Sequence, residues 1–133
     1  YYKSLVVGTG NKVEDFGVGF YTKYGDGGVD ISPIADLLKS EVFSIGKYLR
    51  ITNKILVAKP TDGLWDDNRT DEEQMGINYE EIEEAMRLIS DKIPDKELDV
   101  DQLKARNIYI KLNEQNRHKM KPIPLCEIPK GLL

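Results

Sequence analysis

One short apolar run constrains the possible folds of this chain more than any other feature. Residues 4–7 read Ser-Leu-Val-Val and stop at Gly8-Thr9-Gly10. A continuous run of aliphatic and β-branched residues is typical of a strand buried on both faces, as in a parallel sheet. No clear second strand follows, and a single strand cannot make a sheet. We therefore expect an α/β fold whose other strands come mostly from residues outside this sequence.

Helical patterns dominate the rest of the chain. Ser32-Pro33 resembles a helix entrance, and apolar residues then recur at helical spacing, which predicts a helix within residues 33–50. Asn78 followed by Glu81 is typical of a capped helix start. A further helix is expected over about residues 99–116. The apolar face expected after Asn78 consists of Ile82, Ala85, Met86 and Ile89.

Two segments lack such periodicity. Residues 59–77 contain Pro60, Gly63 and Gly76, and we interpret them as a long loop of the kind that often forms a lid. Three prolines among the last dozen residues predict an extended end rather than a helix.

Composition excludes several classes of protein. The 133 residues suit one domain, and 19 basic against 23 acidic side chains argue against a uniformly basic nucleic-acid binder. No apolar run approaches the roughly 20 residues of a membrane-spanning helix. The single Cys126 can form neither an internal disulfide nor a zinc cluster. We expect a cytoplasmic protein with no nucleic-acid or membrane partner.

Two glycine-containing segments are candidate ligand sites. Gly8-Thr9-Gly10 follows the expected strand, where open α/β sheets bind ligands, and Glu14 could hold Mg²⁺ beside phosphates. A structural turn and a solvated glutamate explain the same residues. Residues 22–30 place three glycines in four positions among charged side chains, which suits a polar ligand but also a β-hairpin turn.

Taken together, the motifs strongly resemble the NAD synthetase family. The matching runs follow the family's order and spacing through most of residues 4–84, and a pair near the end extends the match. They read LVVGTGNK at residues 5–12, TKYGDGGVD at 22–30, PIADL at 33–37, PTDGLW at 60–65, TDE at 70–72, GINYE at 76–80 and HK at 118–119.

The resemblance implies a fold, a reaction and partners. The expected fold is an adenine nucleotide alpha-hydrolase-like (Rossmann-like) parallel sheet with flanking helices, with residues 1–133 forming the C-terminal part of a single synthetase domain. The expected reaction is the ATP-dependent amidation of deamido-NAD to NAD by ammonia, through an adenylated carboxylate. ATP and Mg²⁺ are the implied cofactors, and a homodimer is the implied assembly.

The resemblance also assigns roles to individual residues. It implies ATP contacts for Thr9, Lys39 and Thr61, a Mg²⁺ ligand in Glu14, deamido-NAD contacts for Lys23, Asp30, His118 and Lys119, and a catalytic candidate beside the nicotinate in Asp26. It further implies that the loop of residues 59–77 orders over ATP.

The chain departs from the family in one large respect. The SGGxDS pyrophosphate loop, which supplies a second Mg²⁺ carboxylate in the family, does not occur among the 133 residues. A non-catalytic nucleotide-binding or dimerisation fragment is therefore the alternative hypothesis. No amidotransferase domain is visible in the sequence, which favours ammonia over glutamine as the nitrogen donor.

Overall fold

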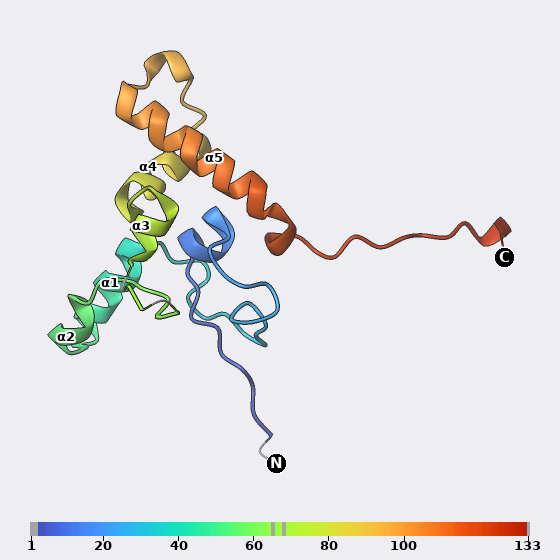
Figure 1. Ribbon diagram of the computed structural model, residues 1–133, viewed down its shortest axis with the longest axis horizontal. Coiled ribbons are helices and arrows are strands. Elements are labelled where there is room, and N and C mark those ends of the chain that lie inside the picture. The colour runs from blue at the N-terminus through green and yellow to red at the C-terminus, as the bar shows by residue number, and fades with distance from the viewer. Residues whose placement is uncertain (1–2, 65, 68, 133) are drawn as a thin grey trace.

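The computed structural model describes residues 3–64, 66–67 and 69–132 and shows a mainly helical chain (Figure 1). A π-helix, η1, comes first and short 3₁₀ turns, η2 and η3, come late. In order, the helical elements are η1 (Lys12–Val18), α1 (Lys39–Tyr48), α2 (Asn53–Leu56), α3 (Asp71–Met75), α4 (Tyr79–Ser90), η2 (Asp95–Glu97), α5 (Val100–Met120) and η3 (Lys130–Leu132).

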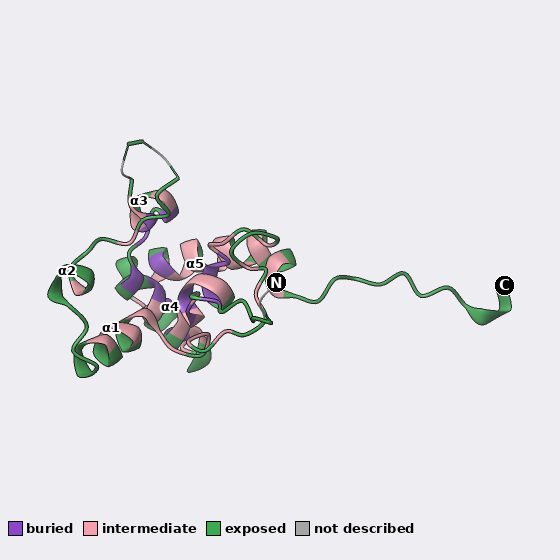
Figure 2. Cartoon of the chain, turned by 90° about the horizontal axis from the view of Figure 1, so that it is seen from below, coloured by how far each residue is buried: buried purple, intermediate pink, exposed green. Residues whose placement is uncertain are grey.

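The core lies where α4, α5 and η1 pack together (Figure 2). Ile82 and Ala85 of α4 are fully buried, and Ile82 belongs to one cluster with Val13 and Val18 of η1 and Ala105 of α5. Burial of such side chains stabilises a fold by roughly 1.5–3 kcal/mol for each large aliphatic residue. The α4 face expected from the sequence therefore forms the centre of the molecule.

The two core helices begin at side-chain caps. Asn78 Oδ1 accepts from the Glu81 backbone N–H at 2.8 Å, and the Glu81 carboxylate accepts from the Asn78 N–H at 3.0 Å. Asp99 and Gln102 make the same reciprocal pair at the start of α5. These bonds satisfy amide groups that have no partner inside the helix. The predicted start of α4 is confirmed, and α5 runs four residues beyond its predicted end.

The helix expected from Pro33 begins later than its sequence pattern suggests. Residues 33–37 form turns, and α1 starts at Lys39. The Leu37 carbonyl accepts from the Lys12 N–H at 2.8 Å, so it is tied to the start of η1. Glu41 then caps α1 by accepting from the Leu38 N–H at 2.7 Å. Both bonds favour a helix start after residue 38.

The interpretation of residues 59–77 as one long loop was wrong in part, because residues 71–75 form α3. Thr70 and Glu73 make a reciprocal cap, with bonds of 2.7 and 3.2 Å, and Gly76 ends the helix at a φ of 70°. This cap is a sequence signal that the proline and glycine content obscured. Trp65 lies outside the described residues.

The expected parallel sheet is not present among the described residues. One parallel bridge pairs Val7 with Ile31, and the Gly8 N–H donates to the Ile31 carbonyl at 2.7 Å. Leu5, Val6 and Val7 are 66%, 56% and 55% exposed, so the predicted burial of the run is not observed in this chain. The pairing is parallel as expected, but no described element covers it.

The end of the chain is extended, as its prolines predict. Residues 121–129 form no helix or strand and lead away from the helices (Figures 1 and 2). None of the described helices combines the length and the apolar character that crossing a bilayer requires.

Candidate functional site

The geometry of the site starts with η1. Buried Asn11 caps this π-helix by accepting from the N–H groups of Val13 and Glu14 at 3.0 and 3.1 Å. Gly19 ends it at a φ of 64°, and a Cβ at Gly19 would lie 2.5 Å from the Cβ of Asn116. Glycine is therefore required where α5 crosses the end of η1.

Three side chains on one face of α5 hold the C-terminal end of η1. Asn113 Nδ2 donates to the Gly17 carbonyl at 2.7 Å, and Asn116 Nδ2 donates to the Val18 carbonyl at 2.9 Å. Lys119 Nζ completes the row by donating to the Gly19 carbonyl at 2.9 Å. Residues 113, 116 and 119 share a face because their spacing is close to one helical turn. Carbonyls that a helix leaves without partners are thus satisfied.

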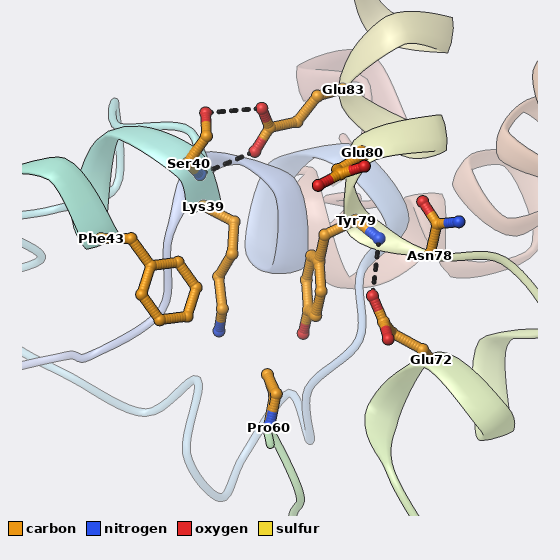
Figure 3. Close-up of a pocket in the computed structure, with 9 residues that line it drawn as sticks. All are labelled: Lys39, Ser40, Phe43, Pro60, Glu72, Asn78, Tyr79, Glu80 and Glu83. Atoms are coloured by element: carbon orange, nitrogen blue, oxygen red, sulfur yellow. Dashed lines mark hydrogen bonds between the residues drawn. The ribbon is translucent and has the colours of Figure 1, made fainter. Parts of the chain in front are cut away.

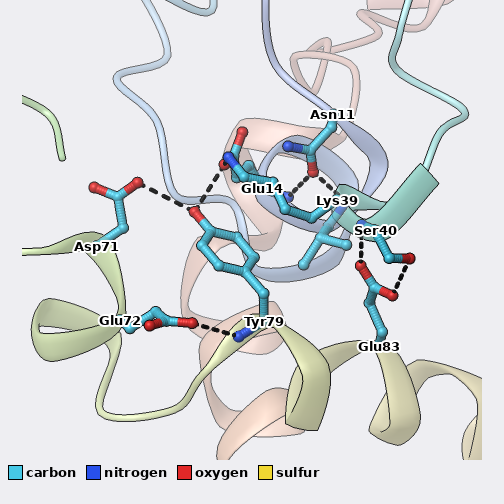
Figure 4. A network of polar contacts seen from close by, with 9 residues as sticks. Asn11, Glu14, Lys39, Ser40, Asp71, Glu72, Tyr79 and Glu83 are labelled. Carbon is cyan, nitrogen blue, oxygen red and sulfur yellow. Dashed lines mark hydrogen bonds and ion pairs between the residues drawn. The ribbon is translucent and has the colours of Figure 1, made fainter. Parts of the chain in front are cut away.

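At the other end of η1, Glu14 pairs with Lys39 of α1 (Figure 4). Lys39 Nζ lies 2.5 Å from Glu14 Oε1, and the two side chains are 17% and 15% exposed. The Tyr79 hydroxyl donates to the same oxygen at 2.7 Å. Lys39 Nζ also lies 4.7 Å from the centre of the Tyr79 ring, a cation–π contact. The candidate metal ligand and a candidate ATP contact are therefore brought together by a tyrosine that sequence analysis did not select.

Asp71, in the first turn of α3, approaches Tyr79 from the opposite side. Its Oδ2 lies 3.1 Å from the Tyr79 hydroxyl oxygen, and its buried Oδ1 has no hydrogen-bond partner within the described residues. Burial raises the pKa of Asp71, and burial together with the Glu14 charge raises the pKa of Tyr79. A hydroxyl carries one hydrogen, so the shorter contact assigns it to Glu14.

A cavity of about 380 Å³ opens beside this group (Figure 3). Lys39 extends between the rings of Phe43 and Tyr79 toward Pro60. On one side, the Glu83 carboxylate accepts from the Ser40 N–H at 2.9 Å and from its hydroxyl at 2.6 Å. The size is that of a small-molecule site with a few polar groups on an apolar lining.

A second group of candidates meets at the end of α5. Lys23 Nζ donates to the His118 carbonyl at 2.6 Å, although 95 positions separate the two residues. Lys119 Nζ, bound to the Gly19 carbonyl, lies 5.6 Å from the Tyr21 ring centre. Three of the four residues matched to deamido-NAD, Lys23, His118 and Lys119, thus lie around the end of α5, whereas Asp30 bonds to Val6.

Asp26 and Asp30 each use one carboxylate oxygen for the backbone. Asp26 Oδ1 accepts from the Thr22 N–H, and Asp30 Oδ2 accepts from the Val6 N–H, both at 2.7 Å. Both side chains are exposed, and their other oxygens accept no hydrogen bond from the described residues. These aspartates fix the glycine-rich turn and keep one oxygen for a ligand.

Asp15 is a residue that sequence analysis missed. Its carboxylate lies against Gly10, where any added Cβ would overlap it. Burial, followed by the charges of Glu14 and Asp26, raises the pKa of Asp15 to about 6. The signal that could have found it is its position between the glycine motif and the glycine-rich turn.

Two candidates are not drawn into either cluster. Thr9 is exposed, and its side chain makes no hydrogen bond with the described residues. Thr61 is exposed and accepts from the Gly63 N–H at 3.0 Å, next to Pro60 of the cavity.

Asp71 and Tyr79 are two further residues that sequence analysis missed. Asp71 was missed because residues 71–75 were interpreted as a loop, and Tyr79 because a residue that follows a helix cap is typical of a core position.

The donors around Glu14 fit part of a Mg²⁺ shell. Glu14 supplies one carboxylate, and the unpartnered Asp71 Oδ1 is a buried oxygen nearby. Among the described residues, no group of three or more His, Cys, Asp and Glu side chains could hold a metal ion. Mg²⁺ is usually bound by one or two carboxylates together with substrate phosphates and water. The residues present therefore fit a site that phosphate oxygens complete.

Comparison with known proteins shows which family the sequence resembles. The NAD synthase family profile matches residues 1–123. The chain is 44% identical to the NH(3)-dependent NAD(+) synthetase of Archaeoglobus fulgidus and 38% identical to that of Methanosarcina acetivorans, covering 93% of this chain and 47% and 49% of those proteins. The chain thus spans about half the length of these relatives.

Solved structures give the same result. The NMN synthetase of Francisella tularensis superposes with a TM-score of 0.72 at 36% identity, over 97% of this chain and 48% of that one. The NH3-dependent NAD synthetase of Campylobacter jejuni, in complex with nitrate, superposes with a TM-score of 0.62 at 27% identity, over 93% and 46%. From the family match and these similarities, the chain belongs to the NAD synthase family.

Proposed function

We propose that this chain supplies the substrate-binding and metal-binding half of an enzyme that converts deamido-NAD to NAD with ATP and ammonia. The observation that carries the proposal is the division of the candidate residues into two clusters joined by η1. One cluster pairs the candidate metal ligand Glu14 with Lys39, and the other gathers Lys23, His118 and Lys119.

The first chemical step needs charge control at the Glu14 end. An oxygen of the nicotinate carboxylate attacks the α-phosphorus of ATP, and pyrophosphate leaves. Mg²⁺ bound at Glu14 would neutralise phosphate charge. Lys39 extends into the cavity and can stabilise the charge that develops on phosphate oxygens. Thr61 adjoins this cavity through Pro60, and Thr9 lies in the glycine loop before η1, so both are proposed ATP contacts.

The second step needs a nucleophile and a proton acceptor. Ammonia attacks the activated carbonyl carbon, AMP leaves with the C–O bond electrons, and the nitrogen loses a proton. We assign the proton to Asp26, which keeps one carboxylate oxygen free of protein partners. Lys23, Asp30, His118 and Lys119 are the proposed contacts of deamido-NAD.

A nicotinate mononucleotide is the second candidate substrate. The Francisella tularensis structure that superposes on this chain is named as an NMN synthetase. The amidated ring is common to both products, so the chemistry at Glu14 and Asp26 would be unchanged. Deamido-NAD carries an adenylate half that nicotinate mononucleotide lacks, so a comparison of the rates with the two substrates distinguishes them.

The test uses the complete polypeptide that contains these residues. It is incubated with ATP, Mg²⁺ and ammonium, and with deamido-NAD or nicotinate mononucleotide in separate reactions. We expect NAD to form, with a higher kcat/KM for deamido-NAD. A higher kcat/KM for the mononucleotide would transfer the assignment to the second candidate. Formation of neither amide would reject both.

The 133-residue chain alone provides the comparison for the fragment hypothesis. Without a pyrophosphate loop we expect it to form no NAD, while the complete polypeptide does. Nucleotide binding without turnover by the complete polypeptide would favour the non-catalytic alternative.

The same proposal includes a homodimer, a parallel sheet completed by further strands and a cytoplasmic location. The exposed apolar run at residues 5–7 and the parallel bridge between Val7 and Ile31 support the proposed sheet.

A further inference from the structure

Tyr79 contacts both members of the Glu14–Lys39 pair, but with different parts of its side chain. Its hydroxyl donates to Glu14 Oε1 at 2.7 Å, and its ring face lies 4.7 Å from Lys39 Nζ. Tyr79 is itself 7% exposed and sits in the first turn of α4. Its backbone N–H donates to the Glu72 carboxylate at 3.1 Å, which further fixes it.

The same group contains a conflict of charge. Lys39 Nζ forms an ion pair with Glu14 Oε1 at 2.5 Å. Both side chains are mostly buried, so water screens their charges only weakly. A divalent cation at this carboxylate would be repelled by the ammonium group. Cation binding at Glu14 and the ion pair with Lys39 are therefore alternatives, unless Lys39 moves away.

We propose that Tyr79 is a positioning residue that makes this exchange possible. Its hydroxyl keeps the Glu14 carboxylate in place when Lys39 leaves, and its ring face keeps Lys39 at the mouth of the cavity when Glu14 takes a cation. Asp71 Oδ2 lies 3.1 Å from the hydroxyl oxygen on the other side. The inference rests on the proposed function for the identity of the cation and of the phosphate ligand.

The two parts of Tyr79 can be tested separately. Tyr79→Phe keeps the ring and removes the hydroxyl, so it should weaken cation binding while leaving the ring contact to Lys39. Tyr79→Leu removes both, so it should weaken cation binding and also ATP binding. Loss of a group that orients a metal ligand typically costs about tenfold in metal affinity, and we expect that factor for both variants.

Tyr109 provides a matched control. It is a half-buried tyrosine packed against the same core, and its hydroxyl makes no hydrogen bond with the described residues. Tyr109→Phe therefore removes the same atom from the same core without touching Glu14. Its affinities for cation and ATP should equal those of the unchanged protein.

The readout is binding rather than turnover. Mn²⁺ is titrated into the complete polypeptide and into each variant, and free Mn²⁺ is followed by electron paramagnetic resonance. ATP is titrated separately by calorimetry without a divalent cation. Thermal unfolding checks that each variant is folded.

The proposal predicts a separable pattern. Tyr79→Phe binds Mn²⁺ more weakly and ATP as before, whereas Tyr79→Leu loses affinity for both. Equal Mn²⁺ affinity in Tyr79→Phe and the unchanged protein would overturn it. So would equal losses of ATP affinity in Tyr79→Phe and Tyr79→Leu. If the unchanged protein binds Mn²⁺ and Tyr79→Phe binds it more weakly, yet no NAD forms, the proposed function fails and this inference stands.

Discussion

Glu14 and Lys119 lie at opposite ends of η1, and their charges are satisfied in different ways. Glu14, in the first turn, meets the cation Lys39 at 2.5 Å, so the two charges cancel. Lys119 donates to the neutral carbonyl of Gly19 at the other end, so its positive charge is retained. Both placements suit the dipole of a helix, which favours anions at its N-terminus and cations at its C-terminus.

The difference indicates which ligand each end can receive. The Glu14–Lys39 pair is neutral, so a ligand must separate the two side chains before it binds either of them. A divalent cation bound to phosphates can do so, because the cation binds the carboxylate and the phosphate binds the ammonium group. A cation held by carbonyl groups is ready for an anionic ligand without any exchange. We therefore expect Mg²⁺ and ATP to act at the Glu14 end, and deamido-NAD to be recognised at the Lys119 end.

The largest expected effect comes from Glu14→Gln in the complete polypeptide. The amide keeps the size of the side chain but removes the charge that would hold Mg²⁺. We expect turnover to fall about a hundredfold, equivalent to roughly 3 kcal/mol of transition-state stabilisation. The Mg²⁺ concentration for half-maximal rate should rise, and the KM for deamido-NAD should change little. Initial rates over a range of Mg²⁺ concentrations measure this, and an unchanged Mg²⁺ dependence would remove Glu14 as the ligand.

Gly19→Ala should disturb the contact between the C-terminal end of η1 and α5. The positive φ and the contact with Asn116 leave no room for a methyl group, so α5 must shift from η1. We expect the free energy of unfolding to fall by about 2 kcal/mol, measured by urea denaturation. Gly63→Ala is the matched control, because Gly63 also has a positive φ but nothing lies within 4 Å of its added Cβ. An equal loss in both variants would show that the contact with α5 contributes nothing.

Lys119→Met should act on deamido-NAD alone. Methionine keeps much of the apolar stem but removes the charge, so the KM for deamido-NAD should rise about tenfold, or roughly 1.4 kcal/mol. The Mg²⁺ dependence should stay as in the unchanged enzyme. Steady-state kinetics with each ligand varied in turn test this. A shift in Mg²⁺ requirement would mean that the two ends are not distinct. Lys121→Met is the control, since this lysine is exposed beyond the end of α5.

The smallest effect is expected at Asp15. Its pKa of about 6 in the folded protein lies above the ordinary 3.8, chiefly because of burial. Between about pH 4 and pH 6 the folded state holds more protons than the unfolded chain, so the free energy of unfolding falls as pH rises. Asp15→Asn should remove this slope and gain about 1 kcal/mol at pH 7, after allowance for solvent screening. Urea denaturation at pH 4.5 and pH 7 measures it, and a parallel pH dependence in both proteins would contradict the assignment.

Sequence reasoning was most successful where local signals agree with packing. The cap at Asn78 predicted the start of α4 correctly. Of the expected apolar face, Ile82 and Ala85 are buried and Met86 and Ile89 are half-buried, and Leu88 is buried beside them.

The helix expected within residues 33–50 is confirmed, but its predicted entrance at Ser32-Pro33 is wrong, because the bond between the Leu37 carbonyl and the Lys12 N–H is a long-range contact that no local pattern contains. Sequence reasoning failed at α3 because the Thr70 cap stands in a segment whose Pro60, Gly63 and Gly76 are typical of a loop.

The site shows the same limit. Family resemblance selected Glu14 and Lys39, but nothing in the sequence indicated that they meet. Tyr79, which lies 65 positions after Glu14, contacts both of them. It stands within the matched run at residues 76–80, but its contacts with the pair follow only from the packing of α4 on η1. Residues 5–7 are exposed rather than buried as predicted, because no described element of this chain covers them.

The central claim is that the Glu14 end of η1 binds Mg²⁺ and ATP while the Lys119 end binds deamido-NAD. Its most direct test is a double-variant cycle in the complete polypeptide. Glu14→Gln, Lys119→Met and the double variant are compared by kcat/KM for deamido-NAD at saturating Mg²⁺. If the two ends of η1 act on different ligands, the losses should add to within about 0.5 kcal/mol. A coupling energy above about 1 kcal/mol would contradict the account, because it would mean that Glu14 and Lys119 share one ligand or one step.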